Sequence, residues 1–402
     1  MDVDQVVTDV AHAVGLAEGE SGIRDSLSAV LTAEPAAVRE IARLAELPVP
    51  IVAATCNELR KLGIVDTHRP VRFTAAGRAA VAHAGVGTEV SVACPECGGR
   101  GEIVPPALAG LAATLQAIAD AMPAVKAELD QTHCTVDTKL GRVLRLQHAR
   151  ALAGQRIVVL GDDDLISVAL AHFAAMTGNA AAIRRLTVVD TDADILDWIG
   201  RQVAGTGVTV ETVRHDLRRQ LPAPLAGGFD VVLTDPPYTV AGAQLFLSRA
   251  VSALVPLPGR HVFFSFGARR PAETLAVQRA MAEMGLVVRS LAAGFNEYLG
   301  AGVLAGTSNL YHLRTAGGAR PLIEGDYDGP LYTADSRAVS TRQYRCVSCK
   351  FLHEVGPGGR WPQIAALQAA GCPVCGGTSF RPMPLSQRGA RGVVPPGKQH
   401  PR

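Results

Sequence analysis

The feature that most constrains this chain is a strict alternation of short apolar segments with helical segments across residues 156–314. Each apolar segment has the length and the side chains of a buried strand, and each helical segment is long enough to cross to the next strand. Strands are predicted over residues 156–160, 186–189, 208–213, 229–234, 261–266, 286–291 and 308–313, the last as a candidate antiparallel hairpin partner. This alternation predicts a doubly wound, Rossmann-like α/β sheet that binds its ligands at the carboxyl ends of the strands.

A polar cluster follows each of the first four predicted strands. The clusters are Gly161–Asp164, Asp190 with Asp192, His215 with Asp216, and Asp235–Tyr238. Because the carboxyl ends of parallel strands meet at one edge of a sheet, we expect these side chains to form one site. A carboxylate after the second strand can bind ribose hydroxyls, so Asp190 is the predicted ribose ligand, and Asp192 either assists it or caps the next helix. Asp216 is predicted to bind an adenine amino group.

The fourth cluster, Asp235-Pro236-Pro237-Tyr238, resembles the motif with which amino-methyltransferases hold a nitrogen nucleophile. In that motif the prolines stiffen the turn, the carboxylate accepts the amine protons and the aromatic ring stacks on the substrate. Asp235 and Tyr238 are therefore the predicted catalytic residues, and Asp235 and Pro236 are predicted to contact the substrate.

The first cluster has one glycine, Gly161, followed by Asp162, Asp163 and Asp164. Methyl transfer from S-adenosylmethionine normally uses several glycines here, so that backbone N–H groups can approach the donor's carboxylate. Three acids would instead repel that carboxylate and attract a tail that ends in an ammonium group. The donor that fits is decarboxylated S-adenosylmethionine, and all four residues are predicted to bind it. The alternative is that Asp164 caps the next helix while Asp162 faces solvent.

Together these motifs resemble the branched-chain polyamine synthases, or N4-bis(aminopropyl)spermidine synthases, which implies a sheet of the class I methyltransferase type. The matching stretches are Gly161–Leu165, Val188–Asp192, Arg214–Arg218, Phe229–Asp230, Thr234–Pro237, Phe246–Arg249 and Phe295–Tyr298. The resemblance covers residues 35–335 and implies a homodimer that adds aminopropyl groups to the secondary amine of spermidine and releases methylthioadenosine. Tyr238 stands where the thermophilic members have an acid, which leaves open a different amine acceptor.

The chemistry of the acceptor assigns further roles. A secondary amine with a pKa near 10 is almost entirely protonated at neutral pH, and its ammonium form cannot attack a sulfonium carbon. Asp235 is therefore predicted to hold and deprotonate the reacting nitrogen, with Tyr238 as part of the pocket wall. Glu297 is predicted to hold a distal amine of the acceptor, and one of the three acids of the first cluster to hold the donor's ammonium.

Six of the eight cysteines form three Cys-x-x-Cys pairs, a spacing that in a reducing compartment indicates metal binding rather than disulfides. Two of these pairs have the spacing of a zinc ribbon, and their four thiolates would close a structural zinc site. The predicted ligands are Cys346, Cys349, Cys372 and Cys375.

The third pair, Cys94 and Cys97, supplies only two ligands. Either it is a half site completed by His133, Cys134 or a partner chain, or it is a turn without metal.

Residues 36–81 follow the order helix, turn, helix and hairpin, which is typical of a winged helix. Such a module either binds DNA through its second helix or serves packing or dimerisation, and only Asn57, Arg60 and Lys61 are available there to read bases. The formal net charge of +2 argues against a dedicated nucleic-acid binder. Two alternative functions remain open: an S-adenosylmethionine-dependent N-methyltransferase acting on RNA or protein, and a DNA-binding regulator that senses a polyamine or nucleoside.

These patterns divide the chain into six parts. They are a winged-helix domain (1–85), a Cys-x2-Cys segment with a helical connector (86–150), a Rossmann-like catalytic domain (151–320), a linker (321–342), a zinc-ribbon-like module (343–380) and a disordered basic tail (381–402). No signal peptide follows Met1, and no stretch reaches the roughly 18 apolar residues that span a bilayer. We therefore expect a cytoplasmic protein with no membrane partner.

Overall fold

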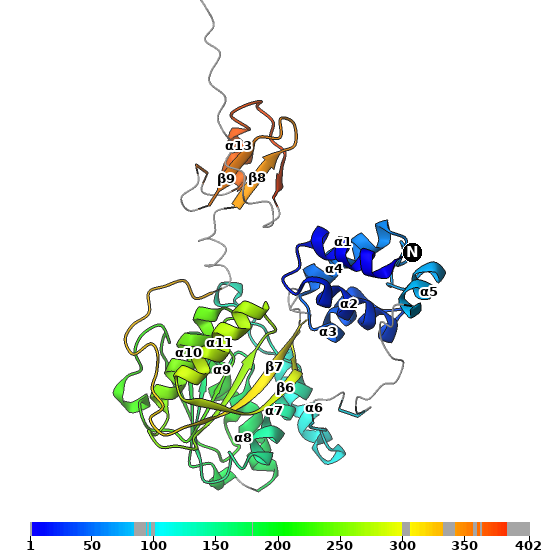
Figure 1. Cartoon of the computed structure of the whole chain (residues 1–402). Coiled ribbons are helices and arrows are strands. Elements are labelled where there is room, and N and C mark those ends of the chain that lie inside the picture. The colour runs from blue at the N-terminus through cyan, green and yellow to red at the C-terminus, as the bar shows by residue number, and fades with distance from the viewer. Residues whose placement is uncertain are drawn as a thin grey trace, which may run out of the picture. The chain divides into compact units, whose positions relative to one another are not determined.

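The computed structural model of the chain describes residues 2–83, 94, 96–97, 101–178, 180–299, 306–332, 342–356, 360–361 and 364–383. The chain divides into two compact units, Met1–Tyr332 and Thr333–Arg402 (Figure 1). From residue 384 onward the predicted basic tail lies outside the described residues. No helix in the described ranges is both long and apolar enough to cross a membrane.

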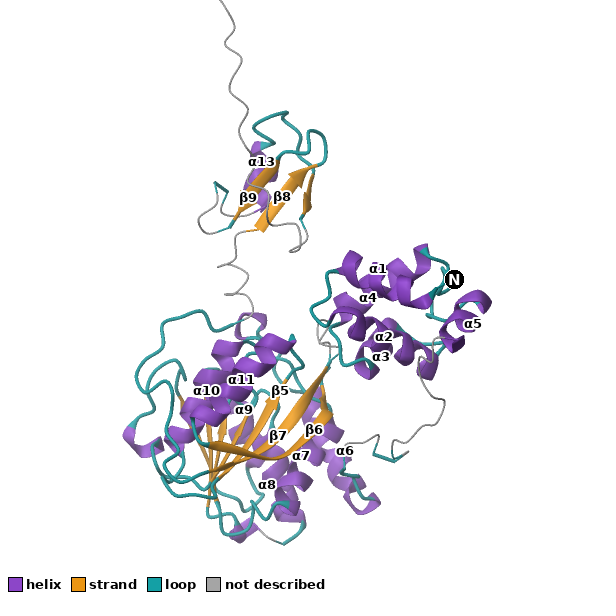
Figure 2. Ribbon diagram, in the orientation of Figure 1, coloured by secondary structure: helices purple, strands orange, loops and turns teal. Residues whose placement is uncertain are grey.

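A seven-stranded sheet lies at the centre of the first unit (Figure 2). Its strands are β1 (Arg156–Leu160), β2 (Arg185–Asp190), β3 (Val210–Arg214), β4 (Val231–Thr234), β5 (His261–Phe266), β6 (Leu286–Glu297) and β7 (Thr307–Thr315). The spatial order is β3-β2-β1-β4-β5-β7-β6. Strands β1 to β5 are parallel, and β7 runs antiparallel to both β5 and β6. The predicted α/β fold with a mostly parallel sheet is confirmed. Strand β6 extends past residue 291, its predicted end, because it continues along β7 beyond two register shifts.

Helices cover both faces of this sheet, which explains why its central strands β1, β4 and β5 are buried along almost their whole length (Figure 2). Ile157 and Val159 of β1 point into one core, whereas Val158 and Leu160 point into the other. The first core also contains residues of α6 (Ala109–Asp120), α7 (Val136–His148), α8 (Ile166–Met176) and α9 (Ala193–Val203). The second contains residues of α10 (Val240–Ala253) and α11 (Pro271–Glu283). Short 3-10 turns are η1 (Pro106–Leu108), η2 (Ala127–Leu129), η3 (Ala180–Ala182) and η4 (Ala223–Leu225).

The N-terminal part of the first unit is helical and has its own apolar core. Its helices are α1 (Val3–Val14), α2 (Gly19–Ala33), α3 (Val38–Leu44), α4 (Val49–Lys61) and α5 (Ala75–His83). Antiparallel bridges join Ala36 to Val71 and Val65 to Phe73 beside α3 and α4. Thr74 caps α5, since its hydroxyl oxygen accepts a backbone N–H one turn along. Helices α1 and α2 precede residues 36–81, the segment for which the sequence predicts a winged helix.

Residues 316–332 contain no helix or strand, yet they belong to the first unit. The fully buried Arg249 donates hydrogen bonds to the backbone carbonyls of Ile323 and Gly325 and to that of Arg218, which follows β3. The beginning of the predicted linker is therefore an arm fastened to the loop after β3.

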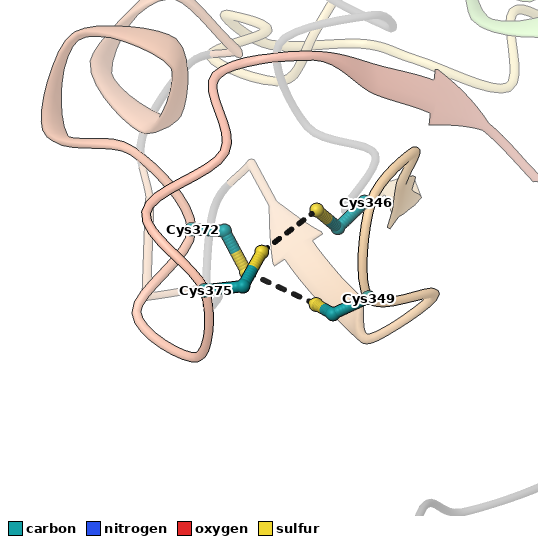
Figure 3. Close-up of side chains that lie close together, drawn as sticks. All are labelled: Cys346, Cys349, Cys372 and Cys375. Atoms are coloured by element: carbon teal, nitrogen blue, oxygen red, sulfur yellow. Dashed lines mark hydrogen bonds between the residues drawn. The ribbon is translucent and has the colours of Figure 1, made fainter.

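The second unit holds a small antiparallel sheet of order β10-β8-β9. Its elements are β8 (Arg342–Cys346), β9 (Leu352–Val355), α13 (Ile364–Ala370) and β10 (Phe380–Pro382). Two Cys-x-x-Cys turns, after β8 and after α13, face each other in this unit (Figure 3).

Candidate active site

The predicted polar clusters follow β1, β2, β3 and β4, which are parallel neighbours in the sheet. The backbone N–H of Asp162 donates to Asp190 Oδ2 at 3.0 Å and joins the first cluster to the second. Arg142 of α7 joins the first cluster to the fourth: its Nη1 lies 2.8 Å from Asp164 Oδ2, and its Nη2 lies 2.8 Å from Asp235 Oδ2.

Asp162 holds the start of α8. It is 1% exposed, and its carboxylate accepts the N–H groups of Ile166 at 2.6 Å and Ser167 at 3.1 Å, together with the Ser167 hydroxyl. Burial raises the pKa of Asp162 to about 7, although these hydrogen bonds lower it. The alternative in which Asp164 caps this helix and Asp162 faces solvent is wrong, because Asp162 is the buried capping residue.

Asp164 is also buried, and both of its oxygens have partners. Oδ1 accepts the Cys134 N–H at 2.6 Å, and Oδ2 accepts from Arg142 at 2.8 Å. Burial favours the neutral acid, but the positive charges of Arg142 and Lys139 outweigh it and lower the pKa of Asp164.

Asp163, between these two acids, is less buried than either. Its Oδ2 accepts the Thr132 N–H at 2.8 Å, and its Oδ1 has no donor among the residues that the structure describes. Burial and then the charge of Asp164 raise the pKa of Asp163 well above its ordinary value. A nearby cation would reverse that shift, so Asp163 is the acid of this loop best placed to receive an ammonium group.

Asp190 and Asp192 follow β2 but have different partners. Asp190 accepts backbone N–H groups from Asp162 at 3.0 Å and Asp192 at 2.8 Å, one on each oxygen, so each oxygen keeps a lone pair. Asp192 caps α9 and also accepts from Lys126 Nζ at 2.6 Å and Gln131 Nε2 at 2.9 Å. The N-cap interpretation of Asp192 is confirmed, and the ribose contacts stay predictions.

Asp216 follows β3, where Arg218 pairs with it. The two side chains approach to 2.8 Å, and the Arg218 N–H donates to Asp216 Oδ1 at 2.9 Å. Partial burial opposes ionisation, but these contacts lower the pKa of Asp216 overall. The contact with an adenine amino group stays a prediction.

Asp235 follows the last residue of β4. Its Oδ2 accepts from Tyr298 Oη at 2.5 Å and from Arg142 Nη2 at 2.8 Å, while its Oδ1 has no donor within the described part of the chain. Burial raises the pKa of Asp235 to about 6, although Arg142 and Tyr298 lower it. A carboxylate with this pKa is ionised at neutral pH and can take up a proton in the reaction.

Tyr238 forms a wall beside Asp235. Its ring packs edge-on against Phe266 with 5.4 Å between centroids, and its hydroxyl donates to Tyr298 Oη at 2.8 Å. Pro236 is buried beneath the motif. The turn therefore presents one open carboxylate oxygen beside an aromatic wall.

The site predicted from the sequence assigns no role to Arg142 or Tyr298, two residues of this network. The available signal for Arg142 is its position in α7: together with Lys139 it falls among the apolar residues Val143 and Leu146, which are buried. Charged residues are almost never fully buried unless they are paired, so such a position predicts an internal partner.

Glu297, the predicted ligand of a distal amine, ends β6 and lines a cavity of about 430 Å³. Its carboxylate lies 3.4 Å from Arg43 Nη1. Ser308 lines the same cavity and lies 2.9 Å from the Tyr298 hydroxyl, which itself donates to Asp235. One wall of the cavity is therefore connected to the Asp235 network.

The four cysteines of the second unit converge on one point (Figure 3). Cys346 Sγ lies 3.6 Å from Cys375 Sγ, Cys349 Sγ lies 3.5 Å from Cys372 Sγ, and the four sulfurs lie within 4.8 Å of one another. These separations fit four thiolates around one tetrahedral metal ion. His353 Nε2 lies 3.3 Å from Cys372 Sγ and can support that thiolate from behind.

Cys94 and Cys97 are not part of a comparable group. Within the described residues the four-cysteine cluster is the group of three or more His, Cys, Asp or Glu ligands close enough to share a metal. His133 lies instead 2.8 Å from the Asp163 carbonyl oxygen, and Cys134 is buried against Asp164. In the described structure, then, neither His133 nor Cys134 completes a half site.

Comparison with known proteins identifies the family. Residues 110–315 match the model of the branched-chain polyamine synthase A C-terminal domain. The chain is also 31% identical over 294 residues to the N(4)-bis(aminopropyl)spermidine synthase of Thermococcus kodakarensis, an alignment that covers 72% of this chain and 80% of that protein. This chain belongs to the branched-chain polyamine synthase family. The resemblance inferred from the sequence is confirmed.

Two further comparisons extend this result. An uncharacterised protein of Methanocaldococcus jannaschii is 32% identical over 380 residues, which cover 94% of this chain and 92% of that protein. In structure, the chain resembles a C9 mutein of the branched-chain polyamine synthase of Thermus thermophilus, solved with N4-aminopropylspermidine and 5′-methylthioadenosine. The TM-score is 0.67 at 25% identity, over 82% of this chain and 96% of that structure. The alignment with the M. jannaschii protein covers 94% of this chain, whereas the alignment with the T. kodakarensis synthase covers 72%.

Proposed function

We propose that this protein moves the aminopropyl group of decarboxylated S-adenosylmethionine onto an amine of a polyamine and releases methylthioadenosine. Family membership supports this reaction type, and the T. thermophilus structure holds an aminopropylated polyamine together with methylthioadenosine. The observation that carries the proposal is the acidic loop after β1, where Asp163 keeps one carboxylate oxygen without a donor in the described structure. A loop of this charge favours a donor whose tail is a cation and disfavours one that ends in a carboxylate.

The donor's ammonium is assigned to Asp163. Asp162 is engaged by the start of α8, and Asp164 is engaged by Arg142 and Cys134, so these two acids shape the loop around it. The ribose hydroxyls are assigned to Asp190 and Asp192, of which Asp190 keeps the freer oxygens. The adenine amino group is assigned to Asp216.

The acceptor is assigned to the Asp235 side of the site. The acceptor reacts as its neutral amine, after the ammonium proton has been lost to solvent. Its lone pair forms a C–N bond at the aminopropyl carbon next to sulfur, and the C–S bond breaks with its electron pair moving to the sulfonium sulfur. The neutral thioether methylthioadenosine leaves, and the proton from nitrogen passes to Asp235 Oδ1. Pro236 and Tyr238 shape the acceptor pocket, and Glu297 receives a distal ammonium. Because sulfonium displacement needs in-line geometry, positioning supplies much of the rate.

The test is a direct incubation of the purified protein with each donor and a panel of amines, read by mass spectrometry. We expect one or two aminopropyl units on a polyamine such as spermidine when decarboxylated S-adenosylmethionine is supplied. A single methyl group on RNA, protein or an amine, formed only from S-adenosylmethionine, would instead establish the N-methyltransferase alternative.

Zinc is proposed as the metal of the second unit. Its four cysteines supply a complete tetrahedral donor set of soft ligands, which suits a closed structural zinc site. Zinc there would hold the two Cys-x-x-Cys turns together and take no part in transfer. We also propose that this unit is a zinc ribbon.

The helices α3 and α4 and their bridges are proposed to form a winged helix with a packing role, and the protein is proposed to be a homodimer. The exposed apolar residues Val287, Val288 and Leu291 on β6, an edge strand of the sheet, are compatible with burial against a second copy. Light scattering tests whether the protein is a dimer. A gel shift that showed tight, sequence-specific DNA binding would establish DNA binding in place of the packing role.

A further inference from the structure

Arg142 is a buried side chain that links the ends of strands β1, β4 and β6. It is 4% exposed and makes four hydrogen bonds with three elements of the fold. Its partners are Asn296 Oδ1 at 2.8 Å from Nε, Asp164 Oδ2 at 2.8 Å from Nη1, and Asp235 Oδ2 at 2.8 Å and Tyr298 Oη at 2.9 Å from Nη2.

The guanidinium approaches Asp235 from one side only. It shares Asp235 Oδ2 with the Tyr298 hydroxyl, which lies 2.5 Å away, and the other oxygen is left without a donor in the described structure. Asn296 fixes the guanidinium from behind, and is itself fully buried and held by Ser308 at 2.8 Å. The carboxylate can therefore neither turn around nor exchange its two oxygens without breaking this network.

We propose that Arg142 is a positioning residue that keeps Asp235 ionised and holds Asp235 Oδ1 toward the reacting amine. The proposal rests on the proposed function, because it concerns the residue to which proton acceptance is assigned. A buried carboxylate next to Asp164 would otherwise favour its neutral form, and a neutral Asp235 cannot accept a proton. One fixed positive charge between the two acids offsets part of the cost of burial and part of their mutual repulsion.

A purely structural role makes a different prediction. If Arg142 only fastens α7 to the strand ends, its loss lowers stability and leaves the pH dependence of the remaining activity unchanged. If it sets the state of Asp235, its loss moves the protonation of Asp235 to higher pH. The pH profile therefore separates the two roles.

The experiment compares Arg142→Met, Arg142→Lys and Tyr298→Phe with wild type, and uses Arg279→Met, an exposed change on α11, as the matched control. For each protein, kcat/KM is measured against pH, and the Asp235 titration is followed by carboxyl ¹³C NMR, assigned by difference from Asp235→Asn. In Arg142→Met we expect the Asp235 titration and the acid limb of kcat/KM to move up by about 1–2 pH units. We also expect kcat to fall about 10–1000-fold, while methylthioadenosine binding changes by less than about threefold.

Arg142→Lys keeps the charge but not the fork, so its titration should stay near that of wild type while kcat falls by about tenfold or more. Tyr298→Phe removes the other donor to Oδ2 and should raise the titration by less than Arg142→Met. It also keeps the test available if Arg142→Met does not fold. A folded Arg142→Met with a wild-type Asp235 titration would overturn the proposal. If that variant does not fold, a wild-type Asp235 titration in Tyr298→Phe together with a wild-type kcat in Arg142→Lys would do the same. Because NMR needs no turnover, a wild type that makes no aminopropylated product would refute the proposed function while leaving the Arg142 assignment to be decided by the titration.

Discussion

The acids at the strand ends and the four cysteines of the second unit are both clusters of ionisable side chains, but they are built in opposite ways. At the strand ends, both carboxylate oxygens of Asp162 and Asp164 accept hydrogen bonds from the protein. Asp163 and Asp235 each keep one oxygen without a donor in the described structure. In the second unit the four sulfurs converge on one another. A site that binds a substrate has to leave polar atoms free to contact it. In a site that only stabilises the fold, the ligand atoms can all face one another.

The two clusters also balance charge differently. At the strand ends a permanent cation from the protein, Arg142, lies between Asp164 and Asp235 and offsets part of their repulsion. In the second unit the described structure places His353 against one of four converging cysteine sulfurs, and a divalent metal is the charge that would balance four thiolates. The comparison therefore predicts that the first cluster is built without metal and needs substrate to complete it, and that the second needs metal to fold.

The largest effect is expected in the second unit. Changing Cys372 to Ser should release the proposed zinc and loosen residues 343–380, because structural zinc binding contributes about 10–16 kcal/mol in small zinc modules. Metal analysis under reducing conditions and hydrogen exchange measure the two consequences. The control is Cys56→Ala, a buried cysteine of α4 outside the cluster, which should keep its metal. Wild-type protein purified without any bound metal would contradict the proposal that the four cysteines form a closed structural metal site.

At the strand ends the largest effect is expected from Asp235→Asn. The amide keeps the size of the side chain but cannot take the proton from the amine, so turnover should fall by about 10²–10⁴-fold. Donor affinity should change little, because the donor's tail is assigned to Asp163. Single-turnover kinetics and calorimetric titration measure the two quantities, with Asp197→Asn on the exposed face of α9 as the matched control. Near-normal turnover would place the proton acceptor elsewhere.

The pH dependence should report the same group. Burial raises the pKa of Asp235 to about 6, and only its ionised form accepts a proton, so activity is lost as pH falls through that value. The acceptor amine, with a pKa near 10, already makes log kcat/KM rise with a slope of about one at neutral pH. Below pH 6 the slope should approach two. A slope that stays at one down to pH 5 would show that Asp235 does not titrate in the reaction.

A smaller effect should separate the three acids of the first loop. Asp163→Asn should reduce the preference for decarboxylated S-adenosylmethionine over S-adenosylmethionine by about tenfold, because it removes the charge nearest the ammonium. Asp162→Asn should instead lower stability by about 1 kcal/mol through the cap of α8 and alter the preference less. Competition binding and thermal unfolding compare the two variants. A larger loss of preference in Asp162→Asn would reassign the ammonium site.

Much of the fold could be predicted from the sequence because the signals are local. The strands at Arg156–Leu160 and Val231–Thr234 are mostly apolar, and the acids that follow them, Asp162–Asp164 and Asp235, mark the ends where ligands are predicted to bind. The two Cys-x-x-Cys pairs of the second unit are separated by a spacing that itself indicates a closed site. In both regions the residue types carry the chemistry directly.

The different roles of Asp162, Asp163 and Asp164 in the acidic loop could not be predicted from the sequence. Which acid stays open depends on the turn into α8, where Leu165 adopts a left-handed backbone conformation with φ of 53° and Asp162 accepts backbone N–H groups of the helix start. It also depends on Arg142, which comes from a helix that precedes the sheet in the chain and meets Asp164 and Asp235 only in the folded structure. Such long-range pairings leave no local pattern beyond a charge on the apolar face of a helix.

The most direct measurement is a calorimetric titration of the wild-type protein with decarboxylated S-adenosylmethionine and, separately, with S-adenosylmethionine. The two nucleosides differ by one carboxylate, so the comparison isolates the sign of the charge that the open oxygen of Asp163 meets. We expect tighter binding of the decarboxylated donor by about tenfold to a hundredfold, the value of one partly screened charge contact of about 1–3 kcal/mol. Equal affinities, or tighter binding of S-adenosylmethionine, would contradict aminopropyl transfer and favour the methyltransferase alternative.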